Sequence, residues 1–134
     1  LKRHGIVLAP TDDTRLISYA LDVGRSGLAP HGLEQLARYY LQHEPMALGE
    51  LLGKGKKAIG FDLVPVAEAT CYAGEGPDTA IRLWRILKPR LAAERKTTVY
   101  ETLERPMVAT LGRMEERGIR IDRDILSRMS GDFA

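Results

Sequence analysis

One tyrosine and two carboxylates lie close together near the middle of the chain, since Tyr72, Glu75 and Asp78 stand at positions i, i+3 and i+6. Carboxylate oxygens are the ligands that hard cations such as Mg²⁺ need, so a metal-dependent reaction would be sought here. In an unbroken helix, however, Asp78 would point well away from Tyr72. The spacing alone favours a structural interpretation, in which Tyr72 is a core aromatic with its hydroxyl at the surface and Asp78 caps a helix.

The segments on both sides of this group are predicted to be helices. Pro65 fits the first turn of a helix that continues to Ala73. Between the two helices, Gly and Pro at residues 74–77 would cost about 1 and about 3 kcal/mol in a helix interior, so we expect a bend there. Trp84 is expected in the core, like most of its apolar neighbours on the second helix. That helix carries apolar residues at helical spacing, namely Ala80, Trp84, Leu87 and Leu91.

Capping residues and apolar periodicity predict helices along most of the remaining chain. Asp13 is placed to cap a helix and Asp122 to cap the last one, while Asp12 is expected to be an ordinary loop residue. Gly118 is placed to end a long helix that Pro106 should kink. The expected helices cover about residues 14–22, 32–42, 47–52, 98–117 and 122 onward.

Strand signals are few: residues 6–8 could be an edge strand or an extended lead-in, and residues 119–121 a short strand or an extended link. The fold class is therefore mainly α with one or two short strands. A chain of 134 residues is long enough for one domain with a core, and 44% hydrophobic and 28% charged residues are typical of a soluble globular protein. No apolar run approaches the roughly 20 residues of a membrane span, so no membrane association is expected.

Charge and cysteine content narrow the function classes. Residues 1–81 carry 8 Lys/Arg and 10 Asp/Glu, whereas residues 82–134 carry 12 and 8. The net charge of +2 is a weaker basic excess than nucleic-acid binders usually show. The single cysteine, Cys71, excludes an internal disulfide, fits a reducing cytoplasm and is expected to be a buried, inert thiol. The histidines lie too far apart in the sequence for a zinc set.

Four motifs follow one another along the chain: Asp13-Thr14-x-Leu16-x-Ser18-Tyr19-x-Leu21, Gly53-Lys54-Gly55-Lys56, Phe61-Asp62…Tyr72-Ala73-x-Glu75-x-x-Asp78…Leu83, and Glu104-x-Pro106-Met107…Arg113-Met114-Glu115-x-x-Gly118-Ile119-x-Ile121-Asp122. In this order they resemble the 3′–5′ exonuclease domain of the bacterial DNA polymerase I family (family A), followed by the entry into its polymerase domain. The resemblance covers nearly the whole chain. It implies that residues 1–96 are the later part of a ribonuclease-H-like exonuclease domain, α/β in the parent, and that residues 97–134 begin the polymerase domain.

The resemblance also implies what a working site would need. Proofreading exonucleases of this family hydrolyse DNA with two divalent metals held by carboxylates from three motifs, the third being Tyr-x-x-x-Asp. Tyr72 matches the tyrosine of that motif, but Gly76 stands at the position of its aspartate. The first motif is absent, and the second would lie upstream of Leu1. Tyr72 is therefore expected to be a catalytic remnant, and Asp78 could be a metal ligand only if Gly76-Pro77 re-aimed the chain.

The parent implied by the resemblance is a DNA-directed DNA polymerase, a nucleotidyltransferase of the cytoplasm that uses Mg²⁺ and acts on DNA in replication and repair. The fragment itself is expected to be inactive, to hold no cofactor and to serve as a scaffold. DNA contacts are expected at Arg113, Arg117 and Arg120. Apolar surface that the parent would cover predicts self-association of the fragment.

Two alternatives remain open. The chain could be a stand-alone helical DNA-binding module, whose affinity would fall steeply with salt, although the small net charge argues against it. It could also be part of an exonuclease of the ribonuclease D kind, which shares the Tyr-x-x-x-Asp pattern. The run from Glu104 to Asp122 resembles the polymerase pattern and argues against that alternative.

Overall fold

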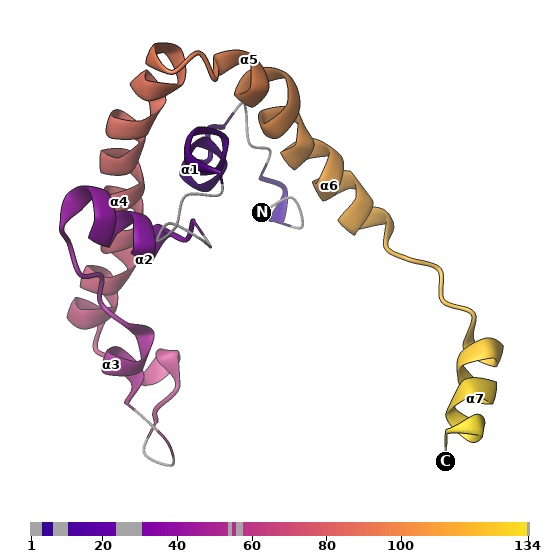
Figure 1. The fold of residues 1–134 in the computed structure, drawn as a ribbon. Helices are drawn as coiled ribbons and strands as arrows, with labels where there is room; N and C mark the ends of the chain where they lie inside the picture. The colour runs from indigo at the N-terminus through magenta and orange to yellow at the C-terminus, as the bar shows by residue number, and fades with distance from the viewer. Residues whose placement is uncertain (1–3, 7–10, 24–30, 54, 56–57, 134) are drawn as a thin grey trace.

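The chain folds almost entirely into helices (Figure 1), as seen in a computed structural model that describes residues 4–6, 11–23, 31–53, 55 and 58–133. The described part contains no strand, and residues 119–121 form an extended link, which is one of the two forms expected there. Most of the strand predicted at 6–8 lies outside the described residues. The elements are α1 (Thr14–Asp22), α2 (Leu33–Leu36), the π-helical turn η2 (Ala37–Leu41), α3 (Leu48–Leu52), the 3₁₀ turn η4 (Phe61–Leu63), α4 (Val66–Ala93), α5 (Thr97–Val99), the π-helical turn η5 (Tyr100–Glu104), α6 (Arg105–Arg117) and α7 (Arg123–Asp132).

Helix α4 continues through residues 74–77, so the two helices predicted on either side are one, and the interruption expected between them is wrong. Pro77 lacks an amide hydrogen and leaves one helical carbonyl, that of Ala73, without its usual donor. Both residues are exposed, so water can hydrogen-bond to that carbonyl. Burial of apolar side chains further along α4 favours one continuous helix, and this tertiary packing outweighs the local propensity of the Gly-Glu-Gly-Pro run.

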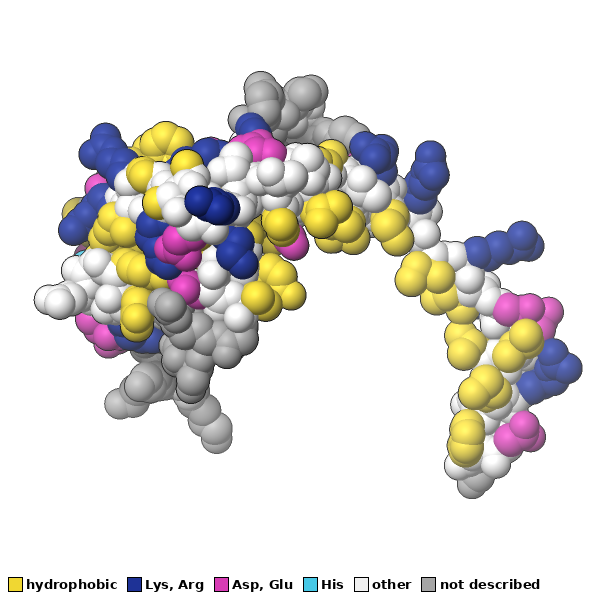
Figure 2. Space-filling view, turned by 45° about the horizontal axis from the view of Figure 1, so that its top comes forward, with side chains coloured by type: hydrophobic (Ala, Val, Ile, Leu, Met, Phe, Trp, Pro, Cys, Tyr) yellow, Lys and Arg dark blue, Asp and Glu magenta, His cyan; other side chains and the backbone are white. Residues whose placement is uncertain are grey.

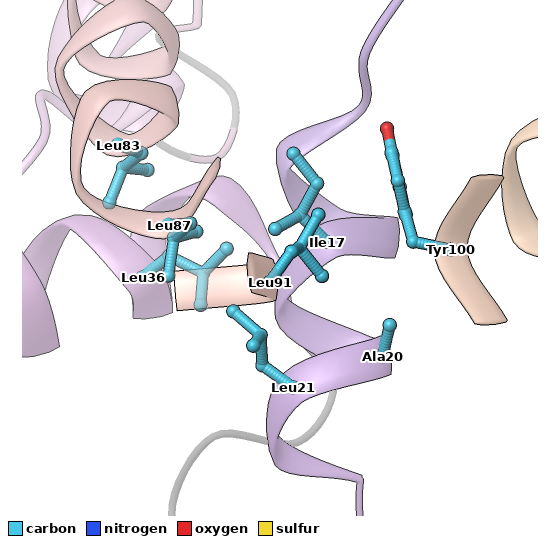
Figure 3. Packing of buried hydrophobic residues seen from close by; sticks show 8 residues of the cluster. All are labelled: Ile17, Ala20, Leu21, Leu36, Leu83, Leu87, Leu91 and Tyr100. Carbon is cyan, nitrogen blue, oxygen red and sulfur yellow. The ribbon is translucent and has the colours of Figure 1, made fainter. Parts of the chain in front are cut away.

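The core forms where α1 and α2 pack against α4 (Figure 3). Trp84 is 41% exposed, so its predicted place in the core is wrong, whereas Leu87 and Leu91 are buried as predicted. The buried stripe of α4 consists of Thr79, Leu83, Leu87 and Leu91. The full cluster of buried hydrophobic residues is Ile17, Ala20, Leu21, Leu36, Leu83, Leu87, Leu91 and Tyr100.

The predicted helix ends are confirmed wherever a local cap defines them. Asp13 Oδ1 accepts hydrogen bonds from the amides of Arg15 and Leu16 at 2.8 and 3.3 Å, which starts α1. Asp122 caps α7 in the same way. Gly118, with φ of +68°, ends α6 in a left-handed conformation that glycine adopts at little cost.

The π-helical turn η5 lies directly before Pro106, the residue at which a kink is predicted. The amide of Arg105 donates to the carbonyl of Tyr100, one residue further back than in an α-helix. Pro106 cannot donate a hydrogen bond to the carbonyl of Thr102, four residues earlier, which favours an irregular turn at this point. Tyr100, at the start of the turn, is fully buried.

Helices α6 and α7 extend away from the body formed by α1, α2 and α4 (Figure 1). Neither helix contains a buried residue. Hydrophobic side chains lie along one side of this arm, with Lys and Arg side chains on the other (Figure 2). None of the described helices combines the length and apolar character needed to cross a lipid bilayer. The exposed hydrophobic residues of the arm are Met107, Val108, Leu111, Met114, Ile119, Ile121, Ile125, Leu126, Met129 and Phe133.

Candidate functional site

Tyr72 lies on the first half of α4 and is partly buried. Its ring packs against Phe61 of η4 with ring centroids 6.3 Å apart and planes inclined by 59°. Tyr72 therefore contacts a local aromatic neighbour and is not a member of the central core cluster. Its side chain lines a pocket of about 260 Å³, and Leu33, Glu34, Pro45, Met46, Ala73, Glu75, Gly76 and Thr79 complete the lining.

Gly76 follows Tyr72 by four residues in the same helix, so both positions share a helical face and line the same pocket. A Cβ atom built at Gly76 would have no atom within 4 Å. The position at which the resemblance leads us to expect a carboxylate is thus sterically open, and it offers no oxygen to a cation.

Glu75 is the carboxylate closest to Tyr72 along α4, and both of its oxygens have partners. Oε1 lies 2.6 Å from Nε2 of His43, and Oε2 accepts a hydrogen bond from the amide of Met46 at 2.9 Å. These two bonds fasten the connection between η2 and α3 to α4. The side chain of Glu75 therefore holds the fold together at this point.

Asp78 lies on a different face of α4 because the helix is continuous between it and Tyr72. Its side chain is exposed, and Oδ2 is 3.5 Å from Nη1 of Arg82 in an i, i+4 pair. Asp78 does not line the pocket of Tyr72. No group of three or more His, Cys, Asp or Glu residues that could hold a metal ion occurs in the described part of the chain.

Two further sequence expectations concern exposed residues. Cys71 is exposed, so the predicted burial of its thiol is wrong. Arg113, Arg117 and Arg120 are also exposed, the first two four residues apart near the end of α6 and the third in the link that follows. Nη2 of Arg113 donates to the hydroxyl of Thr110 at 3.2 Å.

The structure contains a polar cluster around Asp12 that the sequence did not reveal. Nε1 of Trp84 donates to Oδ2 of Asp12 at 2.7 Å. Nζ of Lys88 and the hydroxyl of Tyr100 donate to Oδ1 at 2.9 and 3.0 Å. Burial opposes ionisation of Asp12, but the hydrogen bonds from these three groups outweigh it and hold the pKa of the carboxyl below its ordinary value.

Glu101 completes this cluster from the next residue of η5. Its two oxygens accept hydrogen bonds from Lys88 at 2.9 Å and from Arg105 at 2.6 Å, which lowers the pKa of the Glu101 carboxyl. Burial raises the pKa of the Tyr100 hydroxyl to about 12, and its hydrogen bond to the Asp12 carboxylate acts in the same direction.

A second polar cluster ties α1, η2 and α4 together. Asp22 is buried, and its Oδ2 accepts hydrogen bonds from the hydroxyl of Tyr40 at 2.8 Å and from Nη1 of Arg90 at 3.2 Å. Nη1 of Arg90 also donates to the hydroxyl of Tyr40 at 2.8 Å. Burial, followed by the hydrogen bond to Asp22, raises the pKa of Tyr40. The cluster serves packing, since each polar group satisfies another.

Comparison with known proteins gives one family match and several much longer proteins that are similar to most or all of the chain. The 3′–5′ exonuclease family matches residues 1–92. Over all 134 residues the chain is 51% identical to DNA polymerase I of Rhizobium leguminosarum, of which it covers 13%. It is 34% identical over 122 residues, 90% of the chain, to DNA polymerase I of Pseudomonas aeruginosa, and covers 13% of that protein. It is 33% identical over 129 residues, 96% of the chain, to the thermostable DNA polymerase I of Thermus thermophilus, and covers 12% of it.

The chain thus spans about an eighth of the length of these relatives. The family match ends at residue 92, whereas the similarity to the Rhizobium leguminosarum protein continues to the last residue. The segment containing α5, α6 and α7 therefore resembles a part of these polymerases that lies beyond the matched exonuclease family.

Proposed function

The chain belongs to the 3′–5′ exonuclease family of A-type DNA polymerases, and we propose that it is a segment of a DNA polymerase I whose exonuclease part does not cleave DNA. The parent is a DNA-directed DNA polymerase of the cytoplasm that works in replication and repair with Mg²⁺. The comparison supports this, because similarity to the Rhizobium leguminosarum protein called DNA polymerase I extends through residues 93–134. That extension also favours a polymerase over a ribonuclease D-like exonuclease or a stand-alone DNA-binding module.

The absence of a carboxylate at Gly76, one helical turn after Tyr72, carries the proposal of inactivity. Two-metal hydrolysis depends on carboxylates that hold both ions close to the scissile phosphate. Gly76 supplies none, although there is space for one. Both oxygens of Glu75 are used by His43 and the amide of Met46, and using either on a metal would release the chain between η2 and α3.

The remaining carboxylate of the motif, Asp78, would need a large rearrangement to take part. Reaching the pocket of Tyr72 would require rotating it around α4, and the helix holds its register through the buried Thr79 next to it. Tyr72 then remains as a remnant of the motif without a partner for catalysis. We infer that Asp78 is a surface residue and that no metal binds between it and Tyr72.

In place of hydrolysis, residues 1–96 serve as a scaffold in this proposal, and residues 97–134 lead into the polymerase domain. The end of the family match at residue 92 supports a boundary near residue 97. The ring of Tyr100 is part of the core cluster, so in this proposal the second segment starts packed against the first. The exposed Arg113, Arg117 and Arg120 are proposed to contact DNA phosphates.

The apolar side of α6 and α7 is proposed to be covered in the parent and to cause self-association when the chain is isolated. Contiguous exposed apolar surface of this kind marks interaction sites or aggregation risk. Sedimentation of the isolated chain tests this part of the proposal. Association should weaken when Met114 is replaced by Glu, whereas equal sedimentation of the two proteins at all concentrations would contradict it.

A metal titration tests the loss of the site in the chain itself. Mg²⁺ or Mn²⁺ is added up to millimolar concentration while the amide signals of Tyr72, Glu75 and Asp78 are followed by NMR. We expect no change localised to the pocket of Tyr72. Exposed Glu68, which lies on α4 outside that pocket, reports non-specific binding and serves as the internal control. Localised shifts or broadening at both Tyr72 and Asp78 would contradict the proposal.

A further inference from the structure

The cluster around Asp12 joins three parts of the chain that are far apart in sequence. Asp12 precedes the cap of α1, its partners Trp84 and Lys88 lie on α4, and its partner Tyr100 begins η5. The Asp12 side chain is 18% exposed, so water has limited access to these bonds. Oδ2 of Asp12 thus accepts from Trp84 on α4. Oδ1 accepts from Lys88 on α4 and from Tyr100 on η5.

The cluster also includes Arg105, the first residue of α6, whose positive charge faces two carboxylates. Arg105 donates to Glu101 at 2.6 Å and also donates from Nε to the carbonyl of Thr11 at 3.1 Å. Its Nε lies 3.8 Å from Oδ1 of Asp12. Two carboxylates and two cations therefore balance one another at the base of α6, and Arg105 contacts the same loop that carries Asp12.

Helix α6 has little other support. Its main contact among the described elements is η5, from which it starts, and none of its residues is buried. Figure 1 shows α6 leaving the body at this base and α7 lying at the far end of the arm. The direction of the arm is therefore set by the geometry of η5, and η5 is held by the burial of Tyr100 and by the polar cluster.

We propose that Asp12 acts as a clasp that fixes the direction in which α6 leaves the helical body. Its carboxylate holds the start of η5 against α4, while Glu101 and Arg105 extend the same network to the first turn of α6. The orientation of residues 105–133 relative to α4 is thereby coupled to the loop before α1. Loss of the clasp frees the arm to move while the core of the body remains folded.

Paramagnetic distance measurement between α4 and α6 tests this proposal. Cys71 is exposed on α4 and is the only cysteine, so a spin label can be attached there and a second one at Glu115→Cys on α6. Dilution with unlabelled protein removes distances between molecules. We expect one narrow distance distribution in the doubly labelled chain that keeps Asp12, and a broadened or displaced distribution after Asp12→Ala. Asp78→Ala, which removes an exposed ion pair on α4, should leave the distribution unchanged.

Two milder variants keep the test decisive if Asp12→Ala does not fold. Trp84→Phe removes one hydrogen bond to Asp12 and keeps most of the ring, and Glu101→Gln removes the charge that joins Lys88 to Arg105. Each should broaden the distribution less than Asp12→Ala, with helical circular dichroism unchanged. An unchanged distribution in folded Asp12→Ala, or in both milder variants when Asp12→Ala unfolds, would overturn the proposal.

Discussion

Replacing Tyr100 by Phe should destabilise the protein through one hydroxyl group while leaving the core packed. The hydroxyl donates to Oδ1 of Asp12 at 3.0 Å and accepts from the amide of Asp13 at 3.2 Å. Hydrogen bonds to charged groups contribute about 1.5–3 kcal/mol, and Asp12 keeps its donors from Trp84 and Lys88 in the variant. We therefore expect the free energy of unfolding at neutral pH to fall by about 1.5–3 kcal/mol.

The free energy of unfolding at high pH provides a second, independent test of the Tyr100 hydroxyl. The folded protein holds the pKa of Tyr100 at about 12, compared with an ordinary value of 10.0. The unfolded chain ionises first as the pH rises, so this contribution to stability is fully present below pH 10 and is lost by about pH 12. A pKa difference of this size corresponds to roughly 2–3 kcal/mol.

Urea unfolding followed by circular dichroism, at several values between pH 7 and pH 12, measures both effects. Other groups also titrate in this range, so the quantity of interest is the difference between the two proteins at each pH. That difference should shrink as Tyr100 ionises in the unmodified protein, because Phe cannot. A neutral-pH loss below about 0.5 kcal/mol, or a difference that stays constant to pH 12, would refute the hydrogen-bonding account of Tyr100.

The remaining predictions concern the core, the acid limb and the proline of α4. Leu87→Ala should cost about 2–5 kcal/mol in urea unfolding because the residue is fully buried, whereas exposed Leu111→Ala should change little. The lowered pKa values of Asp12 and Glu101 stabilise the fold above about pH 4.5, and we expect the free energy of unfolding to fall as the pH drops below that value. Pro77→Ala should raise the melting temperature, because it restores a hydrogen bond within a continuous helix; a lower melting temperature would indicate a bend at that position.

Local signals in the sequence were enough to place most helices. Asp13, Asp122 and Gly118 act on amides or carbonyls within a few residues, so the ends that they define could be predicted without knowledge of the fold. The continuity of α4 could not be predicted in this way. Its Gly and Pro residues oppose a helix locally, and only the packing of its second half against α1 and α2 explains why the helix continues.

In the candidate site, too, local features could be predicted from the sequence and contacts between distant residues could not. That Tyr72 and Gly76 share one helical face could be predicted from the sequence, because they are one helical turn apart. The structural roles of Glu75 and Asp12 could not, because their partners lie up to 32 and 88 residues away in the chain. Trp84 lies outside the buried stripe of α4 and donates to Asp12, a partner that no periodicity of α4 indicates.

Primer hydrolysis by the proposed parent polymerase is the decisive test of whether its exonuclease part is inactive. A primer with a mismatched 3′ nucleotide is incubated with the polymerase that carries this chain and Mg²⁺, without nucleoside triphosphates, and the length of the primer is followed. Extension of a matched primer in the presence of triphosphates confirms that the protein is folded. If the exonuclease part is inactive, the primer is not shortened beyond what is seen when Mg²⁺ is chelated. Rapid removal of the mismatched nucleotide that depends on Mg²⁺ and is lost in Tyr72→Phe would contradict the proposed inactivity.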